Sequence, residues 1–327
     1  MRKIFVVMLV TIMVNLSSVL CISGASVDKI ELPPAFQREL LPAGVTPDSW
    51  FYGLKKLSEN IDLFFTFDVL AKAKKLAYYA EIRLAEAKEL AENGKTEFLN
   101  DLFKAYKLNL ENSNELVETA NQFGKNVTKV TELIAVSTSI HVDILEEILQ
   151  QVPEKTKLYI QNAINYSKMV NIESLDLMER VQPELAAEIH LRIAEKRLLK
   201  AQEKSQVNKS EIVTNLILEY EERLKKSCQI VEISKEIGKN TMNLERLITE
   251  ATSTHLEVLS DVYVKVQGQT TKNDVEKALN ISLYEIENTI EAFPRKNVFS
   301  DIVNATSLEK IEASVLGFTS NSSYGHE

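Results

Sequence analysis

Proline is almost absent from the greater part of this chain. Between Gly53 and Pro294 the only prolines are Pro153 and Pro183, and the whole sequence of 327 residues contains 7 prolines and 9 glycines. A β-sandwich or a β-barrel needs many tight turns and normally carries more of both residues. Hydrophobic residues make up 45% of the chain, which is enough to bury a core. The sequence therefore predicts an all-α fold built from long helices.

Two stretches of the chain repeat each other. Residues 98–145 align without gaps on residues 212–259, at an offset of 114, and 15 of the 48 pairs are identical, including Tyr106 with Tyr220 and His141 with His255. Upstream, residues 82–86 resemble residues 191–195 at an offset of 109, which predicts about five extra residues in the second copy near residues 202–209. We interpret the pattern as a tandem duplication of one helical unit.

Hydrophobic spacing divides each copy into helices. In the first copy, apolar residues recur three or four positions apart over residues 68–93, 96–123 and 128–152, with Gly94 and Gly124 as stop signals and Gly238 matching Gly124 in the second copy. Pro153 opens a shorter fourth helix. Short loops favour antiparallel neighbours with coiled-coil-like packing. We expect one antiparallel bundle at residues 68–172 and another at 173–293, joined by a long helix over about 159–206 that bends at Pro183.

The first 25 residues have the organisation of a secretory signal peptide. Arg2 and Lys3 precede an apolar run at residues 4–14, and small residues lie at Ser23 and Ala25. We expect cleavage after Ala25. The alternative is an uncleaved anchor, because residues 4–20 reach the short limit of a membrane span. A lipoprotein site at Cys21 is disfavoured by the large residue before it. No later apolar run approaches 18 residues, so the predicted location is secreted or cell-surface.

Charge and cysteine content narrow the possible partners. The net charge is −9, and it becomes −11 when residues 1–25 are removed, because that segment carries two basic residues and no acid. A net acidic chain is a poor binder of nucleic acid, which requires a basic patch.

Cys228 is the only cysteine after cleavage and cannot form an intramolecular disulfide, so we expect a buried thiol or an intermolecular bridge. Residues 294–327 are polar and predicted to be partly disordered.

Six Asn-x-Ser/Thr sequons follow the predicted cleavage site. In an exported protein they are possible glycan sites on exposed positions. They are Asn126, Asn165, Asn208, Asn280, Asn304 and Asn321.

An aromatic segment precedes the first copy. Residues 26–67 combine an extended stretch with an amphipathic helix that starts after Pro47-Asp48-Ser49. One face of this helix carries apolar side chains at spacings of three and four: Trp50, Leu54, Leu57, Ile61 and Phe64. We interpret it as a short amphipathic helix that caps the open end of the bundle. The alternative is a helix that docks on a membrane interface or a partner through Trp50, Phe51, Phe64 and Phe65, with Lys55 and Lys56 in support.

Several motifs resemble a known family. They are the Pro-Asp-Ser-aromatic opening with Leu54 and Lys55, Asp68, the helix motif at residues 80–87, His141 with its apolar followers, and Val152-Pro153-Glu154. Over residues 42–170, and more weakly in the second copy, they resemble domain-of-unknown-function family 5667, an uncharacterised group of exported helical proteins of archaea and bacteria. The chain departs from the family at Trp50 and Gly53, and the second copy has Val266-Gln267-Gly268 at the last motif. The resemblance implies an exported helical fold and no particular activity.

The repeat-matched histidines are the most interesting candidates for chemistry. We interpret His141 and His255 as hydrogen-bonding residues between helices, with a contact from Glu118 or Glu232 as one possibility; the alternative is a metal site, which would need three or four converging ligands. The pairs Arg83–Glu86 and Arg192–Glu195 are interpreted as surface or groove salt bridges. The sequence contains no nucleophile elbow, phosphate loop or His-Glu-x-x-His motif.

These observations predict an exported, non-catalytic helical protein of the cell surface or envelope, with a structural or interaction role and a protein partner or self-association. We expect no enzyme activity and no cofactor. The alternative is an extracellular bundle that binds a small ligand or a metal through His141 and His255.

Overall fold

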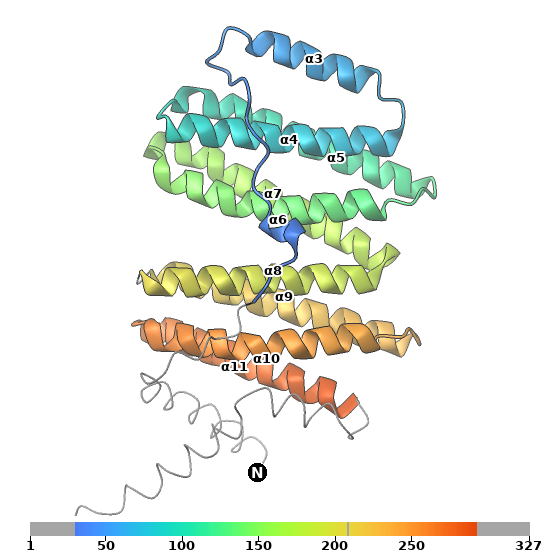
Figure 1. Ribbon diagram of the computed structural model, residues 1–327, viewed down its shortest axis with the longest axis vertical. Helices are drawn as coiled ribbons and strands as arrows, with labels where there is room; N and C mark the ends of the chain where they lie inside the picture. The colour runs from blue at the N-terminus through green and yellow to red at the C-terminus, as the bar shows by residue number, and fades with distance from the viewer. Residues whose placement is uncertain (1–29, 208, 293–327) are drawn as a thin grey trace, which may run out of the picture. The chain divides into compact units, whose positions relative to one another are not determined.

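The computed structural model describes residues 30–207 and 209–292, and every regular element in this part of the chain is a helix (Figure 1). The predicted signal peptide and the polar tail lie outside the described residues. The all-α prediction is confirmed. The elements are α2 (Pro34–Gln37), α3 (Tyr52–Phe64), α4 (Val69–Glu92), the 3₁₀ turn η1 (Thr96–Phe98), α5 (Leu99–Gln122), α6 (Thr128–Gln151), α7 (Glu154–Val181), α8 (Pro183–Gln206), α9 (Ser210–Glu236), α10 (Met242–Lys265) and α11 (Gln269–Ala292).

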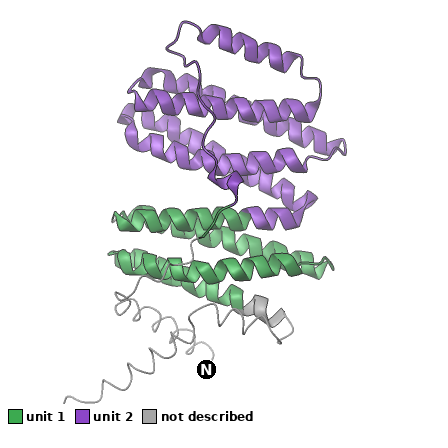
Figure 2. Ribbon diagram, in the orientation of Figure 1, with its two compact units in different colours: residues 1–32, 190–327 green, residues 33–189 purple. Residues whose placement is uncertain are grey.

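The chain divides into two compact units, each of which holds one copy of the duplicated sequence (Figure 2). Unit 2 comprises residues 33–189 and contains α2 to α7 with the first residues of α8. Unit 1 comprises residues 1–32 and 190–327, and its described part contains the remainder of α8 with α9, α10 and α11.

The helix bounds show how the two copies correspond. α4 and α8 have the same length at an offset of 114, and so do α6 and α10. The predicted five-residue insertion in the second copy is therefore wrong. Three identical pairs at this offset are completely buried: Ala80/Ala194, Leu84/Leu198 and Ala87/Ala201. A shift of five residues would turn them about 140° around the helix, away from the buried face.

The sequence predicted that the fourth helix of the first copy is shorter than the others. This prediction is wrong, because α7 is longer than α4, α5 and α6. α7 has 28 residues and continues past the predicted end of the first copy at residue 172. Beyond that residue α7 stays packed on the unit, because Leu175, Leu177 and Met178 are buried. The polar residue at the predicted end is buried as well. Asn171 donates from Nδ2 to the Ala135 carbonyl at 2.7 Å and to Thr138 Oγ1 at 3.2 Å on α6. The helix ends before Pro183, so α7 and α8 are separate helices.

Glycine ends three of the helices, as predicted. Gly94, Gly124 and Gly238 have φ angles of 71°, 72° and 79°, in the left-handed region that favours glycine. After α4, the N–H of Lys95 donates to the Leu90 carbonyl at 2.8 Å and the N–H of Gly94 donates to the Ala91 carbonyl at 3.0 Å. This is a Schellman motif, which satisfies carbonyl groups that the helix end would leave unpaired.

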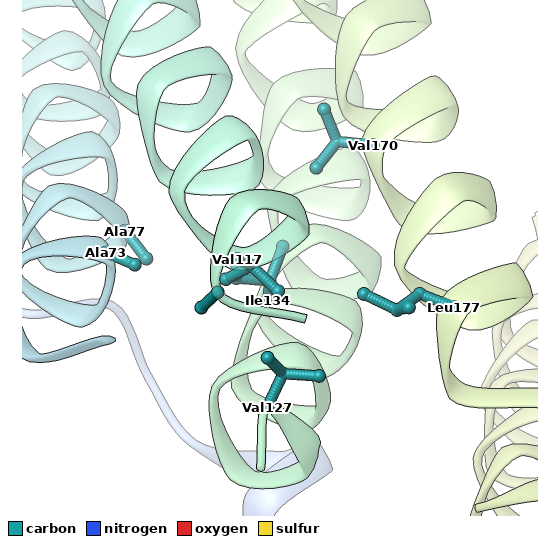
Figure 3. Packing of buried hydrophobic residues seen from close by; sticks show 8 residues of the cluster. Ala73, Ala77, Val117, Val127, Ile134, Val170 and Leu177 are labelled. Atoms are coloured by element: carbon teal, nitrogen blue, oxygen red, sulfur yellow. The ribbon is translucent and has the colours of Figure 1, made fainter. Parts of the chain in front are cut away.

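The core of unit 2 lies between two pairs of neighbouring helices. α4 packs on α5 and α6 packs on α7, while α4 also contacts α6 and α5 contacts α7. A cluster of buried apolar residues joins all four helices (Figure 3). Its members are Ala73 and Ala77 on α4, Val117 and Ala120 on α5, Val127 before α6, Ile134 on α6, and Val170 and Leu177 on α7.

Candidate functional site

Each unit buries a small polar cluster around its histidine. In unit 2, His141 on α6 is fully buried, and its Nδ1 lies 3.1 Å from the hydroxyl oxygen of Tyr106 on α5. The same hydroxyl lies 2.7 Å from Oγ of Ser167 on α7. The Ser167 hydroxyl donates to the Ala163 carbonyl at 2.8 Å. This chain of hydrogen bonds connects three helices through the middle of the unit.

A carboxylate completes the cluster of unit 2. Glu81 on α4 places Oε2 at 3.8 Å from Nε2 of His141, and Arg38 donates from Nη2 to the same oxygen at 2.7 Å. Arg38 also donates to Ser137 Oγ on α6 at 2.7 Å. Burial raises the pKa of the Glu81 carboxyl, but the hydrogen bonds and charges of His141 and Arg38 outweigh this effect and lower the pKa to about 2. Glu81 is therefore ionised, and Arg38 fastens the segment before α3 to two helices.

Unit 1 contains the same arrangement. Tyr220 places its hydroxyl oxygen 3.1 Å from Nδ1 of His255 and 2.7 Å from Oγ of Ser282, and Nε2 of His255 lies 3.7 Å from Oε1 of Glu195. The arginine differs: Arg192, on the same helix as Glu195, donates to both carboxylate oxygens at 2.9 and 3.1 Å. The geometry around the tyrosine is thus kept, while the cation that neutralises the carboxylate comes from another part of the chain.

The structure corrects the predicted glutamate contacts. Glu118 and Glu232 are exposed, and the carboxylate near each histidine comes instead from Glu81 or Glu195. Sequence reasoning missed Glu81 because the offset of 109 paired Glu195 with Glu86. Extending the offset of 114 into α4 would have identified the Glu81/Glu195 pair. Within the described ranges, no three or more His, Cys, Asp or Glu side chains gather in a way that could hold a metal ion.

The predicted surface salt bridge of Arg83 is buried. Arg83 and Glu86 have no exposed side-chain surface, and Nη2 of Arg83 lies 3.2 Å from Oε1 of Glu86. Arg83 also pairs with Glu59 of α3 and donates from Nη1 to the Tyr52 hydroxyl at 2.6 Å. Lys55 of α3 pairs with Glu86. The surface interpretation is wrong here because α3 covers this side of α4. The second pair, Arg192–Glu195, is also largely buried.

Burial changes the acid–base properties of this junction. It raises the pKa of the Glu86 carboxyl, and hydrogen bonding to Lys55 and the charge of Arg83 offset only part of that increase. A buried ionic junction of this kind is costly to break, since the removal of one member leaves the other charge without its partner.

α3 lies beside α4 (Figure 1). Its polar side faces α4, since Tyr52 contacts both Glu86 and Arg83. The polar residues of α3 recur at spacings of three and four, and they meet a matching polar stripe on α4. The α3 stripe is Tyr52, Lys55, Glu59 and Asp62, and the α4 stripe is Lys75, Tyr79, Arg83 and Glu86. α3 therefore covers α4 with its polar side. The apolar face that the sequence identified does not pack on the bundle, because the surface that α3 covers is charged.

The apolar side chains of α3 and its flanks point to solvent. Trp50 is 93% exposed, Leu57 55% and Phe64 73%. We call this surface the α3 outer face, and it comprises Trp50, Phe51, Leu54, Leu57, Ile61, Phe64, Phe65 and Phe67. It contains all four residues that the sequence offered as docking candidates: Trp50, Phe51, Phe64 and Phe65.

The remaining candidates lie apart from these two sites. Cys228 is a buried free thiol whose pKa is raised by burial, and it borders an open depression in unit 1 with Lys225, Glu232 and Lys277. Among the sequons, Asn126 and Asn165 are exposed and Asn280 is partly buried; Asn208, Asn304 and Asn321 lie outside the described residues.

Comparison with known proteins supports the family and the fold. Residues 44–155, which contain α3, α4, α5 and α6, match the family model "Domain of unknown function (DUF5667)", the family that the sequence motifs resemble. No curated protein matches the chain.

Among solved structures, the chain is similar to a "Circular tandem repeat protein with novel repeat topology and enhanced subunit contact surfaces". The TM-score is 0.50 and the sequence identity is 14%. The match covers 73% of this chain and 50% of the other, so our chain spans half the length of that protein. At this identity the likeness shows an all-α tandem-repeat fold and nothing of activity.

Proposed function

We propose that this protein is an exported, non-catalytic helical protein that acts at the cell surface or in the envelope by presenting surfaces to partners. The observation that carries the proposal is the α3 outer face. Large apolar side chains lie side by side there in solvent, and an ionic junction fixes the helix that bears them. Contiguous exposed apolar patches of this kind mark interaction sites. Support for export comes from the sequence of residues 1–25.

The two buried polar clusters support a structural use of the histidines. A catalytic base must lie within hydrogen-bond reach of its substrate. His141 and His255 are fully buried, and each contacts a tyrosine and a glutamate from neighbouring helices. A substrate could reach either ring only if those helices separated. The hydrogen bonds connect helices and help to fix their register.

The alternative, a metal or small ligand held by the histidines, has no comparable support. A structural metal site uses three or four ligands at about 2.0–2.3 Å. In each unit the histidine ring lies between a tyrosine hydroxyl at 3.1 Å and one carboxylate. The nitrogens that would bind a metal are therefore directed at protein groups.

Chemical cross-linking on intact cells of the native source tests the proposal. We expect the protein to fractionate with the envelope and to give reproducible cross-links to envelope components or to another copy of itself. A Leu57→Glu, Ile61→Glu variant should lose these links, and Phe123→Glu, which changes an exposed apolar residue outside α3, should keep them. A free monomer in the medium without links would overturn the proposal. Hydrolysis of glycans, peptides or phosphoesters at enzyme-like rates would overturn its non-catalytic part.

A further inference from the structure

We infer that the α3 outer face binds the surface of a lipid bilayer, with the axis of α3 parallel to the membrane. The inference rests on the proposed interaction role and specifies the chemistry of the partner.

The order of side chains along the α3 outer face fits a membrane interface. Aliphatic residues Leu54, Leu57 and Ile61 form its middle. Aromatic residues form both ends, with Trp50 and Phe51 before the helix and Phe64, Phe65 and Phe67 at or after its last turn. Amphipathic helices that lie in the interface present Trp, Phe and Leu to the acyl boundary, and aromatic rings concentrate at the headgroup level.

The charge of the α3 outer face matches a neutral lipid surface. The most exposed residues between positions 50 and 67 are uncharged, and the Lys56 and Asp62 side chains are 36% and 43% exposed. The charged residues of α3 are paired: Lys55 with Glu86, Glu59 with Arg83, and Asp62 with Lys75, while Lys56 lies 3.1 Å from Glu59. Insertion of this face into the acyl boundary therefore requires no desolvation of an unpaired charge. It also gains nothing from anionic headgroups.

The α3 outer face is formed before it meets a partner. Arg83, Tyr52 and Lys55 hold α3 against α4 through buried contacts, so binding requires no folding of the helix. Within residues 30–207 and 209–292, no helix has the length and apolar character to cross a membrane. The inferred contact is therefore peripheral, at the depth of the headgroups and the first methylene groups.

Trp50 provides the test, because it is the only tryptophan in the chain. With the full chain and phosphatidylcholine vesicles, we expect the Trp50 emission to shift to the blue and to be quenched by lipids brominated near the headgroup. Emission is preferable to sedimentation as the measurement, since residues 4–20 are also apolar. The Leu57→Glu, Ile61→Glu variant keeps Trp50 and should bind about 100-fold more weakly, while Phe123→Glu should respond like the wild type.

The response should not require phosphatidylglycerol and should persist at high salt, where the repulsion between the net acidic chain and an anionic surface is screened. A response that requires anionic lipid, an unchanged emission, or a wild-type response in the Leu57→Glu, Ile61→Glu variant would overturn the inference. An emission shift that appears without vesicles as protein concentration rises would assign the face to a second copy. The variant's helical circular dichroism and melting temperature confirm that it folds. Envelope cross-links without a vesicle response would refute only the lipid inference, and a vesicle response without envelope association would refute only the proposed function.

Discussion

The buried carboxylate beside each histidine lies close to an arginine, but the two units obtain that arginine from different parts of the chain. Glu81 is neutralised by Arg38, which lies 43 positions away, and Glu195 by Arg192 on the same helix. Removing a charged group from water is costly unless an opposite charge and hydrogen bonds compensate. The duplication thus kept the tyrosine, histidine and glutamate, and each copy compensated the glutamate with a residue available to it. In unit 2 that residue also anchors the segment that leads to α3.

The pH dependence of stability tests the role of Glu81. Its pKa in the folded protein is about 2, below the ordinary 4.5, so the ionised form contributes stability that is fully present above pH 4.5 and is lost as the pH falls toward 2. In urea unfolding series between pH 6 and pH 2.5, the wild type should lose stability more steeply below pH 4.5 than Glu81→Gln.

The oppositely shifted Glu86 serves as the control for that experiment. Its folded-state pKa is raised, so protonation of Glu86 favours the folded state as the pH falls toward 4.5. The Glu86→Gln variant should therefore lack the increase in the free energy of unfolding that the wild type shows as the pH falls toward 4.5. Below pH 4.5, its free energy of unfolding should fall with pH as steeply as that of the wild type. Parallel curves for the wild type and Glu81→Gln would show that Glu81 does not carry the acid sensitivity.

At the scale of one helix, α3 reverses the usual relation between polarity and burial. Its charged residues pair with residues of α4, and its large apolar residues are exposed to solvent. Removing Arg83 would leave Glu59 and Glu86 buried without this cation, so Arg83→Ala should lower the free energy of unfolding by about 3–5 kcal/mol. Leu57→Ser, on the exposed side, should change it by less than about 0.5 kcal/mol. Urea denaturation of both variants gives the comparison, and a larger loss for Leu57→Ser would contradict the orientation of α3.

Replacement by alanine should have opposite effects on stability at Gly94, which follows α4, and at Gly53, which lies within α3. Gly94 has a φ of 71°, and a methyl group added there would meet only open space, so Gly94→Ala should cost about 1–2 kcal/mol through backbone conformation alone. Gly53 lies in the first turn of α3 without a positive φ and with equally open space. Gly53→Ala should therefore stabilise the protein by up to about 1 kcal/mol. Thermal unfolding should show melting-temperature shifts of opposite sign; equal shifts would contradict the Schellman end of α4.

The features predicted correctly from sequence were those set by local signals. Glycine stops and apolar spacing placed α4, α5 and α6 within a few residues of their observed bounds. The errors arose where contacts with a distant part of the chain determine which side of a helix is buried or where a helix ends. The polar stripe of α4 determines which side of α3 is buried. Contacts with the other helices of unit 2 keep α7 packed beyond residue 172, where Leu175 and Leu177 are buried. The Glu81–His141 contact was missed because the Arg-x-x-Glu motifs of the two copies align at an offset of 109. The buried alanines of α4 and α8 match only at an offset of 114.

At the scale of the whole chain, the two copies share their buried polar cluster and differ in the segments outside the repeat. Each unit keeps a buried tyrosine between a histidine and a serine. Unit 2 also has α3 with its exposed apolar face and an arginine supplied from outside the repeat. The duplicated core thus provides stability in both units, while the surface proposed for interaction belongs to unit 2 and to the segment that matches the family model.

Because each polar cluster lies within one unit, matched tyrosine variants should act locally. Tyr106→Phe removes one hydrogen bond each from His141 and Ser167, and Tyr220→Phe does the same for His255 and Ser282, at a cost of about 1–3 kcal/mol. Amide hydrogen exchange followed by mass spectrometry should show about 5- to 150-fold faster exchange in α4 to α7 for the first variant and in α9 to α11 for the second. Tyr166→Phe, whose ring is only partly buried and lies against Lys107, should leave both patterns unchanged. If Tyr106→Phe and Tyr220→Phe accelerated exchange equally in both units, the local role of each polar cluster would be contradicted.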